Sequence, residues 1–404
     1  MRPAPPGPRS SASPSRKRPR GGPKAVNERA IDIPARAALI AARADDELEQ
    51  LVAISSPSGD VPGAEAALSL CASWLPAEAI VERVPCSTPD SADDLVARVR
   101  GTGSRRVLLL GHVDTVVSHA AHVPPRRVGD RLYGPGTVDM KGGVVLAVEL
   151  ARALADHPSL FAELGVLLVT DEEWRTVQFQ HVDRFAGWDA CLCFEAGELT
   201  DDGVWGVVVR RKGAGALRVR ASGRAAHSGS APHLGVNALL ALCGAAIAVA
   251  GTADPDGPEQ LTVTPTMMHA GEALNVVPAS GELLFDLRSR DVTAFARVRD
   301  AVPASLGGAS LEATLERVWP AMDSEAATIP LLAAAGARVG RPILARARGG
   351  ASDASHFAPT IPLTVDGLGP RGGGAHTPGE FVSLSSLVER AELALALALA
   401  ALED

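Results

Sequence analysis

The stretch VLLLGHVDTV at 107–116 joins an apolar run to polar residues and decides the fold class. Two similar runs follow, LGVLLVTDEEW at 164–174 and DACLCFEAGE at 189–198. Short strands without polar alternation, separated by helical segments such as 143–155, are typical of a parallel or mixed sheet covered by helices. The sequence therefore predicts a mixed, mostly parallel α/β sheet. Polar residues that follow its strands should gather at one edge.

The segment 212–318 has a different pattern, which indicates an inserted domain. Apolar and polar residues alternate at 216–221, as in a half-buried strand. An apolar helical face follows at 236–247. We expect a small α+β insert with two helices on an open antiparallel sheet. The main domain would then consist of 31–211 and 319–404.

Composition and charge are those of a globular protein with an unusual amino-terminal segment. The 404 residues are 46% apolar and 21% charged, with a formal net charge of −8, which excludes disorder throughout. Residues 1–30 hold eight basic residues against one acidic residue and are rich in Pro and Ser. Such a segment cannot bury a core. We expect a disordered basic tail rather than a nucleic-acid patch, and no nucleic-acid partner.

The cysteine content and the hydropathy of the chain indicate the cellular compartment of the protein. No uncharged apolar run of about 18 residues occurs, so we expect neither a membrane span nor a membrane partner. The five cysteines are odd in number and lack a disulfide-like spacing, which indicates a reducing compartment. The tail also lacks the apolar region of a secretory signal. The sequence therefore predicts a cytoplasmic protein.

Polar side chains follow each of the three apolar runs. His112 and Asp114 are two residues apart and should leave the same face of an extended chain. A carboxylate beside a His is the usual arrangement of a metal-binding imidazole. The acids at 171–173 close the second run and would repel one another unless cations neutralise them. Glu195 follows the third run.

Two glycine-rich stretches complete the set of candidate ligands. RLYGPGTVDMKGGV at 131–144 surrounds Asp139, and GLGPRGGGAHTPGE at 367–380 carries His376. Mixed nitrogen and carboxylate ligands suit Zn²⁺ or related divalent ions. Two ions about 3.5–4 Å apart that share one carboxylate would use the whole set.

The order of these motifs resembles that of the di-zinc metallopeptidases that include acetylornithine deacetylase, succinyl-diaminopimelate desuccinylase, aminoacylase and glutamate carboxypeptidase. The resemblance covers about residues 40–403 and is greatest to glutamate carboxypeptidase. It is carried by the following motifs, in chain order: G-H-x-D-T-V, Y-G-P-G-x-x-D-M-K-G-G, T-D-E-E, F-E, H-S-G with G-V-N-A, N-V-V-P-A and a late His.

The resemblance implies a site with two zinc ions, with Co²⁺ or Mn²⁺ as possible substitutes. Asp139 would bridge the two metals. His112 and Glu195 would complete one metal site, and Glu173 and His376 would complete the other. The sheet would be the zinc-peptidase type, and the insert would be the family's dimerisation or lid domain, which implies a homodimer.

The resemblance also implies the roles of residues that do not bind metal. Glu172 would be the general base that deprotonates the attacking water, and Asp114 would orient His112. His227 would reach the active site of the partner subunit and stabilise the developing oxyanion. Asn275 and Arg288 would bind the substrate carboxylate. Arg288 also alternates with the apolar residues of its predicted strand, so it should face away from the core of the insert.

These observations favour a hydrolase that cleaves an amide bond adjacent to a free carboxylate. Its substrate would be a small N-acyl or peptidyl amino acid, from which it releases the amino acid. One alternative is a deacetylase of N-acetyl amino acids. The other is a metal-free binding protein on the same scaffold.

The sequence departs from the family in one segment. Relatives usually follow their Glu pair with small Gly or Ser residues, whereas this chain continues WRTVQF at 174–179. We expect these bulky residues to border the site and to narrow the cleft or alter specificity. In the later stretch RGGASDASHFA, we expect Asp353 and His356 to support the site rather than to bind metal.

Overall fold

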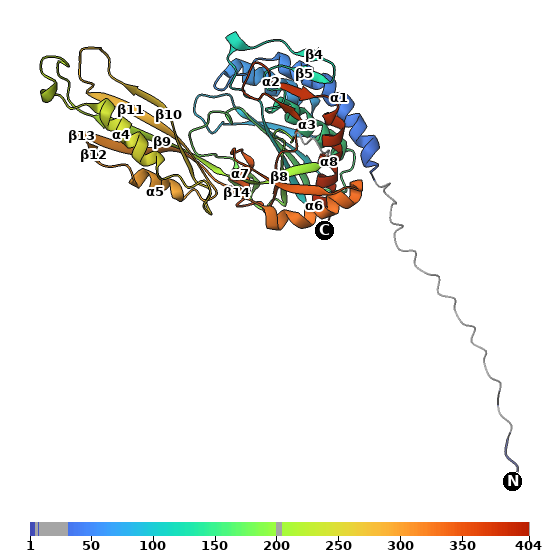
Figure 1. The fold of residues 1–404 in the computed structure, drawn as a ribbon. Coiled ribbons are helices and arrows are strands. Elements are labelled where there is room, and N and C mark those ends of the chain that lie inside the picture. Colours follow the sequence, from blue (N-terminus) through green and yellow to red (C-terminus); the bar gives the residue numbers. More distant parts are fainter. Residues whose placement is uncertain (5–6, 8–30, 199–203, 404) are drawn as a thin grey trace. The chain divides into compact units, whose positions relative to one another are not determined.

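The computed structural model describes residues 1–4, 7, 31–198 and 204–403 (Figure 1). The basic tail expected at 1–30 lies almost entirely outside the described residues and stays a prediction. Residues Ile33–Asp404 form one compact unit. Its α-helices are α1 (Ile33–Ala53), α2 (Val61–Trp74), α3 (Lys141–Ala155), α4 (Ala238–Ala250), α5 (Ala294–Asp300), α6 (Glu325–Val339), α7 (Ala354–Phe357) and α8 (Ser386–Ala401). Short 3₁₀-helices are η1 (His119–Ala121), η2 (Val182–Phe185) and η3 (Pro232–Leu234).

Among the described residues, the central sheet has six strands in the order β1-β2-β6-β3-β7-β16. Strands β6, β3, β7 and β16 are parallel to one another, whereas β2 pairs antiparallel with both β1 and β6. The mixed, mostly parallel sheet predicted from the sequence is therefore confirmed. Its strands are β1 (Ile80–Val84), β2 (Asp94–Arg100), β3 (Arg106–His112), β6 (Glu163–Val169), β7 (Ala190–Cys193) and β16 (Leu363–Val365).

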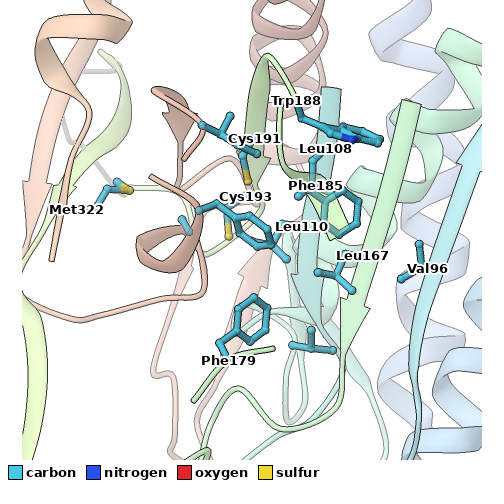
Figure 2. Close-up of a cluster of buried hydrophobic side chains, with 14 of the residues drawn as sticks. Val96, Leu108, Leu110, Leu167, Phe179, Phe185, Trp188, Cys191, Cys193 and Met322 are labelled. Atoms are coloured by element: carbon cyan, nitrogen blue, oxygen red, sulfur yellow. The ribbon is translucent and has the colours of Figure 1, made fainter. Parts of the chain in front are cut away.

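The two faces of this sheet are covered differently. Helix α3 packs on β3 and β6, and α1 and α8 pack beside it (Figure 1). On the other face, Leu108 and Leu110 join a buried cluster with Phe179, Phe185 and other residues (Figure 2). Gly111 of β3 approaches Val144 of α3, and alternate residues of a strand point to opposite faces, so these two leucines lie on the face away from α3. The buried rings and the short helix α7 therefore supply the second layer.

A second sheet is built from the part of the chain predicted to be the insert. Its five antiparallel strands follow the order β10-β11-β9-β13-β12, and α4 and α5 pack on it (Figure 1). In β11 the residues Leu283, Phe285 and Leu287 are buried, whereas their neighbours are half-buried. This alternation gives the sheet one apolar face. Its strands are β9 (Gly213–Ser222), β10 (Thr262–Ala270), β11 (Ser280–Ser289), β12 (Ser305–Leu306) and β13 (Ala309–Trp319).

The described residues also form two smaller sheets. One has the order β14-β8-β15, and the other has the order β17-β18-β5-β4. No helix in the described part of the chain is both long and apolar enough to cross a membrane. The strands are β4 (Arg126–Val128), β5 (Arg131–Tyr133), β8 (Trp205–Arg211), β14 (Met322–Asp323), β15 (Ile343–Arg348), β17 (Gly372–Gly373) and β18 (Phe381–Ser383).

Candidate metal centre

Three neighbouring parallel strands bring the candidate ligands to one edge of the central sheet. His112 is the last residue of β3, Glu195 follows the end of β7 by two residues, and Glu173 follows β6. These strands are adjacent and parallel, so their carboxyl ends meet. Asp139 lies just before α3, and His376 lies on the loop between β17 and β18.

The ligand atoms form two groups that share Asp139. His112, Asp139 and Glu195 make one group, and Asp139, Glu173 and His376 make the other, with the atoms of each group within 4.8 Å of one another. His112 Nε2 lies 3.4 Å from Asp139 Oδ1 and 3.8 Å from Glu195 Oε1. His376 Nε2 lies 3.1 Å from both Asp139 Oδ2 and Glu173 Oε1.

A buried atom shows that this geometry fits metal ions. His112 Nε2 is buried and has no hydrogen-bond partner among the described residues. An unpaired buried polar atom is costly, whereas a metal ion would satisfy it. Burial, and then the charge of Asp139, raises the pKa of Glu195 to about 8. The grouped carboxylates therefore favour a bound cation.

Asp114 connects the metal ligands to the acidic turn after β6. The imidazole Nδ1 of His112 lies 3.0 Å from the carbonyl oxygen of Asp114 and 3.3 Å from its carboxylate. That carboxylate also accepts hydrogen bonds from Ser58 Oγ at 2.6 Å and from the backbone N–H groups of Glu172 at 3.2 Å and Glu173 at 3.1 Å. Burial opposes the charged form, but these hydrogen bonds hold the pKa of Asp114 below its usual range. Asp114 therefore contacts both the imidazole of His112 and the backbone of the two glutamates.

Comparison with known proteins gives the family. Residues 108–400 match the model of "Peptidase family M20/M25/M40". The chain belongs to this peptidase family. Carboxypeptidase G2 of Pseudomonas sp. (strain RS-16) is 29% identical over 372 residues, 86% of each chain. Succinyl-diaminopimelate desuccinylase of Methylorubrum extorquens (strain PA1) is 30% identical over 360 residues, 76% of this chain and 86% of the relative.

Solved structures agree with the M20 fold. A tripeptidase from Staphylococcus aureus subsp. aureus Mu50 has a TM-score of 0.73 at 21% identity, covering 89% of this chain and 98% of that one. The aminopeptidase PepT of Bacillus cereus ATCC 10987 has a TM-score of 0.71 at 19% identity, covering 90% and 99%. The resemblance predicted from the motifs is thus confirmed, and the M20 chain is a metal-dependent hydrolase of the peptidase and amidohydrolase class.

Glu380 holds the loop of the M20 chain that carries Asp139. Its carboxylate is buried and accepts hydrogen bonds from the backbone N–H groups of Gly136 at 3.0 Å, Val138 at 2.9 Å and Asp139 at 3.1 Å. The sequence analysis missed this residue. Its only signal was a carboxylate four residues after His376, in the same glycine-rich stretch.

The bulky segment after the Glu pair is organised around Arg175. This fully buried guanidinium pairs with Asp171 at 2.7 Å and with Asp353. It lies between the rings of Phe179 at 4.4 Å and Trp319 at 4.7 Å. Asp171 and Asp353 are therefore engaged by an arginine, and neither belongs to the metal-ligand groups.

His356 lies beside this arginine rather than among the metal ligands. Its ring packs 5.0 Å from those of Phe179 and Trp319. Burial, together with the charges of Arg175 and Arg317, lowers the pKa of His356 to about 3. The imidazole is therefore neutral and contributes packing to the M20 chain.

The three candidate residues of the predicted insert bond to neighbouring residues rather than to the candidate ligands. His227 Nδ1 accepts hydrogen bonds from the N–H groups of Gly229 and Ser230, and the carbonyl of Asn275 accepts one from Ser228. Arg288 pairs with Asp286 two residues away. In the described part of a single chain, none of the three candidates has a hydrogen bond or ion pair with the five ligands.

Proposed function

We propose that this M20 chain is a dinuclear zinc hydrolase that cleaves an amide bond next to a free carboxylate. It releases an amino acid, as a glutamate carboxypeptidase does, from a small N-acyl or peptidyl substrate. The observation that supports this proposal is the pair of ligand groups sharing Asp139. Each group combines a His nitrogen with two carboxylates, a donor set that suits Zn²⁺, with Co²⁺ or Mn²⁺ as substitutes.

Glu172 is the proposed general base. Bound divalent cations would polarise the scissile carbonyl and lower the pKa of water. Glu172 belongs to neither ligand group, yet it precedes the ligand Glu173 directly, and Asp114 holds the backbone of both. Its carboxylate accepts the proton of the attacking water and passes it to the leaving nitrogen. A base that is not itself a ligand stays free for this transfer.

The second sheet is proposed to supply the remaining contacts, acting as the dimerisation and lid domain of residues 212–318. His227 of the partner subunit would stabilise the oxyanion, with Asn275 on the neighbouring loop. Their separation from the five ligands within one chain supports a role across a homodimer. Arg288 would bind the α-carboxylate of the substrate; this role is supported by its half-buried position on the face of β11 opposite the apolar one.

The test compares an N-acyl amino acid with its α-carboxamide on the zinc-loaded enzyme. The wild type should prefer the acid, because the amide cannot form the charge-assisted pair with Arg288, a loss of about 1.5–3 kcal/mol. This loss corresponds to about 10-fold to 150-fold in kcat/KM. Arg288→Ala should abolish the preference. Equal rates for the acid and the amide in the wild type would contradict the proposal.

The same assay discriminates the alternative functions. A deacetylase should accept acetyl but not larger acyl groups at the same amino acid. A metal-free binding protein should hydrolyse neither compound after incubation with zinc, cobalt or manganese. The cytoplasmic location stays a prediction, and all five cysteines are free thiols in the structure.

A further inference from the structure

Arg317, near the end of β13, is a cation without a counter-ion among the described residues. Its guanidinium stacks 4.2 Å from the ring of Trp319, and its Nε is buried without a hydrogen-bond partner. Within the described residues, no carboxylate lies within ion-pair distance of Arg317, which makes no hydrogen bond through its side chain. A buried donor that lacks a partner costs about 1–3 kcal/mol. A ligand that pairs with it would recover this cost.

The sheet register places Arg317 on the same face as Arg288. Ala216 of β9 is opposite Arg317 on one side and opposite Asp286 on the other. Directly opposed residues point to the same face of a sheet, and so do residues two apart on one strand. Arg317, Asp286 and Arg288 therefore share a face. Only the methyl groups of Ala216 and Ala214 lie between the arginines on β9, so β9 contributes no bulky side chain between them.

The carboxylate of Asp286, which shares this face, is already engaged. Asp286 accepts hydrogen bonds from Arg288 Nε and from a terminal nitrogen of the same guanidinium at 2.9–3.2 Å. It has no ion pair with Arg317. Asp286 is thus engaged by Arg288, and the guanidinium of Arg317 is left without an ion pair among the described residues.

Contacts connect Arg317 to the turn that carries the proposed base. Trp319 lies against Arg317 and donates a hydrogen bond from its indole N–H to the carbonyl of Arg175 at 3.3 Å. Arg175 follows Glu172 by three residues in the acidic turn. Burial lowers the pKa of Arg317, and the charges of Arg288 and Arg175 lower it further, against the attraction of Glu172 and Asp353. The strongest attraction comes from the proposed base itself.

We infer that the substrate carries two carboxylates and that Arg317 binds the one that Arg288 does not bind. This inference rests on the proposed function and specifies its substrate class as dicarboxylic N-acyl amino acids. The second carboxylate belongs either to the side chain of the released amino acid or to the acyl group. A planar guanidinium recognises a carboxylate through two parallel hydrogen bonds, and its stacking on Trp319 fixes the plane.

The experiment uses two pairs of substrates, each differing only by a carboxylate and a carboxamide. N-acetyl-glutamate and N-acetyl-glutamine test an acidic side chain. N-succinyl-leucine and its succinamide analogue test an acidic acyl group. In the zinc-loaded wild type, kcat/KM should favour the diacid in at least one pair by about 30-fold or more, the lower range for leaving a buried cation unpaired.

The variants then assign the preference to Arg317. Arg317→Met keeps the packing on Trp319 but should bring the acid-to-amide ratio within about threefold of one. Arg317→Lys keeps a point charge and should retain part of the ratio. Arg220→Met is the matched control, because Arg220 is exposed on the same face of the sheet, opposite Glu312 and Glu282. It should leave the ratio unchanged.

Distinct outcomes separate this inference from the proposed function. Equal hydrolysis of acid and amide in both pairs by the wild type overturns the inference and leaves the proposed function standing. A diacid preference that survives in Arg317→Met overturns the assignment of Arg317. Absence of hydrolysis of all four compounds overturns both. The wild-type ratio needs no variant, so a misfolded Arg317→Met still leaves the inference falsifiable.

Discussion

Replacing Glu380 tests whether the loop of Asp139 is held as the structure indicates. In Glu380→Gln, the amide oxygen can replace the carboxylate oxygen that accepts from Val138 and Asp139. The amide nitrogen must then face the N–H group of Gly136, donor against donor. One charge-assisted hydrogen bond is lost and a buried donor is left unpaired, at a cost of about 2–3 kcal/mol.

This loss should appear both in stability and in metal binding. For a compact unit of this size, about 2–3 kcal/mol corresponds to a fall in Tm of about 3 °C in the chelator-treated protein. Residues that orient metal ligands typically contribute about 10–100-fold to metal affinity. We therefore expect zinc competition titrations to show a loss in this range. Unchanged Tm and unchanged zinc affinity in Glu380→Gln would refute the reasoning.

A matched control separates the loss of these contacts from the loss of a charge. Glu389 is on α8, is exposed and pairs with Arg371 at 3.2 Å. Surface ion pairs contribute about 0–1 kcal/mol. Glu389→Gln should therefore shift Tm by about 1 °C or less and should leave zinc affinity unchanged.

Three further predictions follow from other parts of the structure. Glu172→Gln should keep zinc and substrate binding but lower kcat by at least about 10²-fold, whereas Glu173→Gln should weaken zinc binding; normal turnover in the first variant would exclude Glu172 as the base. Burial, and then the charge of Glu149, raises the pKa of Glu47 from its usual 4.5 to about 7, so the folded state holds a proton that the unfolded state releases. The stability that Glu47 contributes to the folded state is fully present below about pH 4.5 and is lost as the pH rises through about 7, by about 3 kcal/mol in total. The free energy of unfolding measured by denaturation should therefore fall from about pH 5 to pH 8 in the wild type and should vary less with pH in Glu47→Gln. Light scattering should give the mass of a homodimer, and a fully active monomer would contradict the role of His227 across the interface.

The fold and the grouping of the candidate ligands could be predicted because both follow from local patterns. Apolar runs without polar alternation indicate buried strands, and the carboxyl ends of parallel neighbours meet whatever the rest of the chain does. His112, Glu173 and Glu195 follow such strands directly. Glu380 was not predictable on these grounds. Its role depends on β18 pairing with β5, which brings it beside a loop about 240 residues earlier in the chain.

The segment after the Glu pair shows how tertiary contacts decide the role of an acidic run. The sequence presents Asp171, Glu172 and Glu173 as three carboxylates in need of cations. Arg175, from the same turn, provides one of these cations because it pairs with Asp171. Its guanidinium also pairs with Asp353. Among the described residues, the other two acids have no arginine partner. Glu173 belongs to a ligand group, and Glu172 does not. Relatives usually carry small residues at this place in the chain. Here Arg175 is accommodated because it neutralises Asp171, the carboxylate that belongs to neither ligand group.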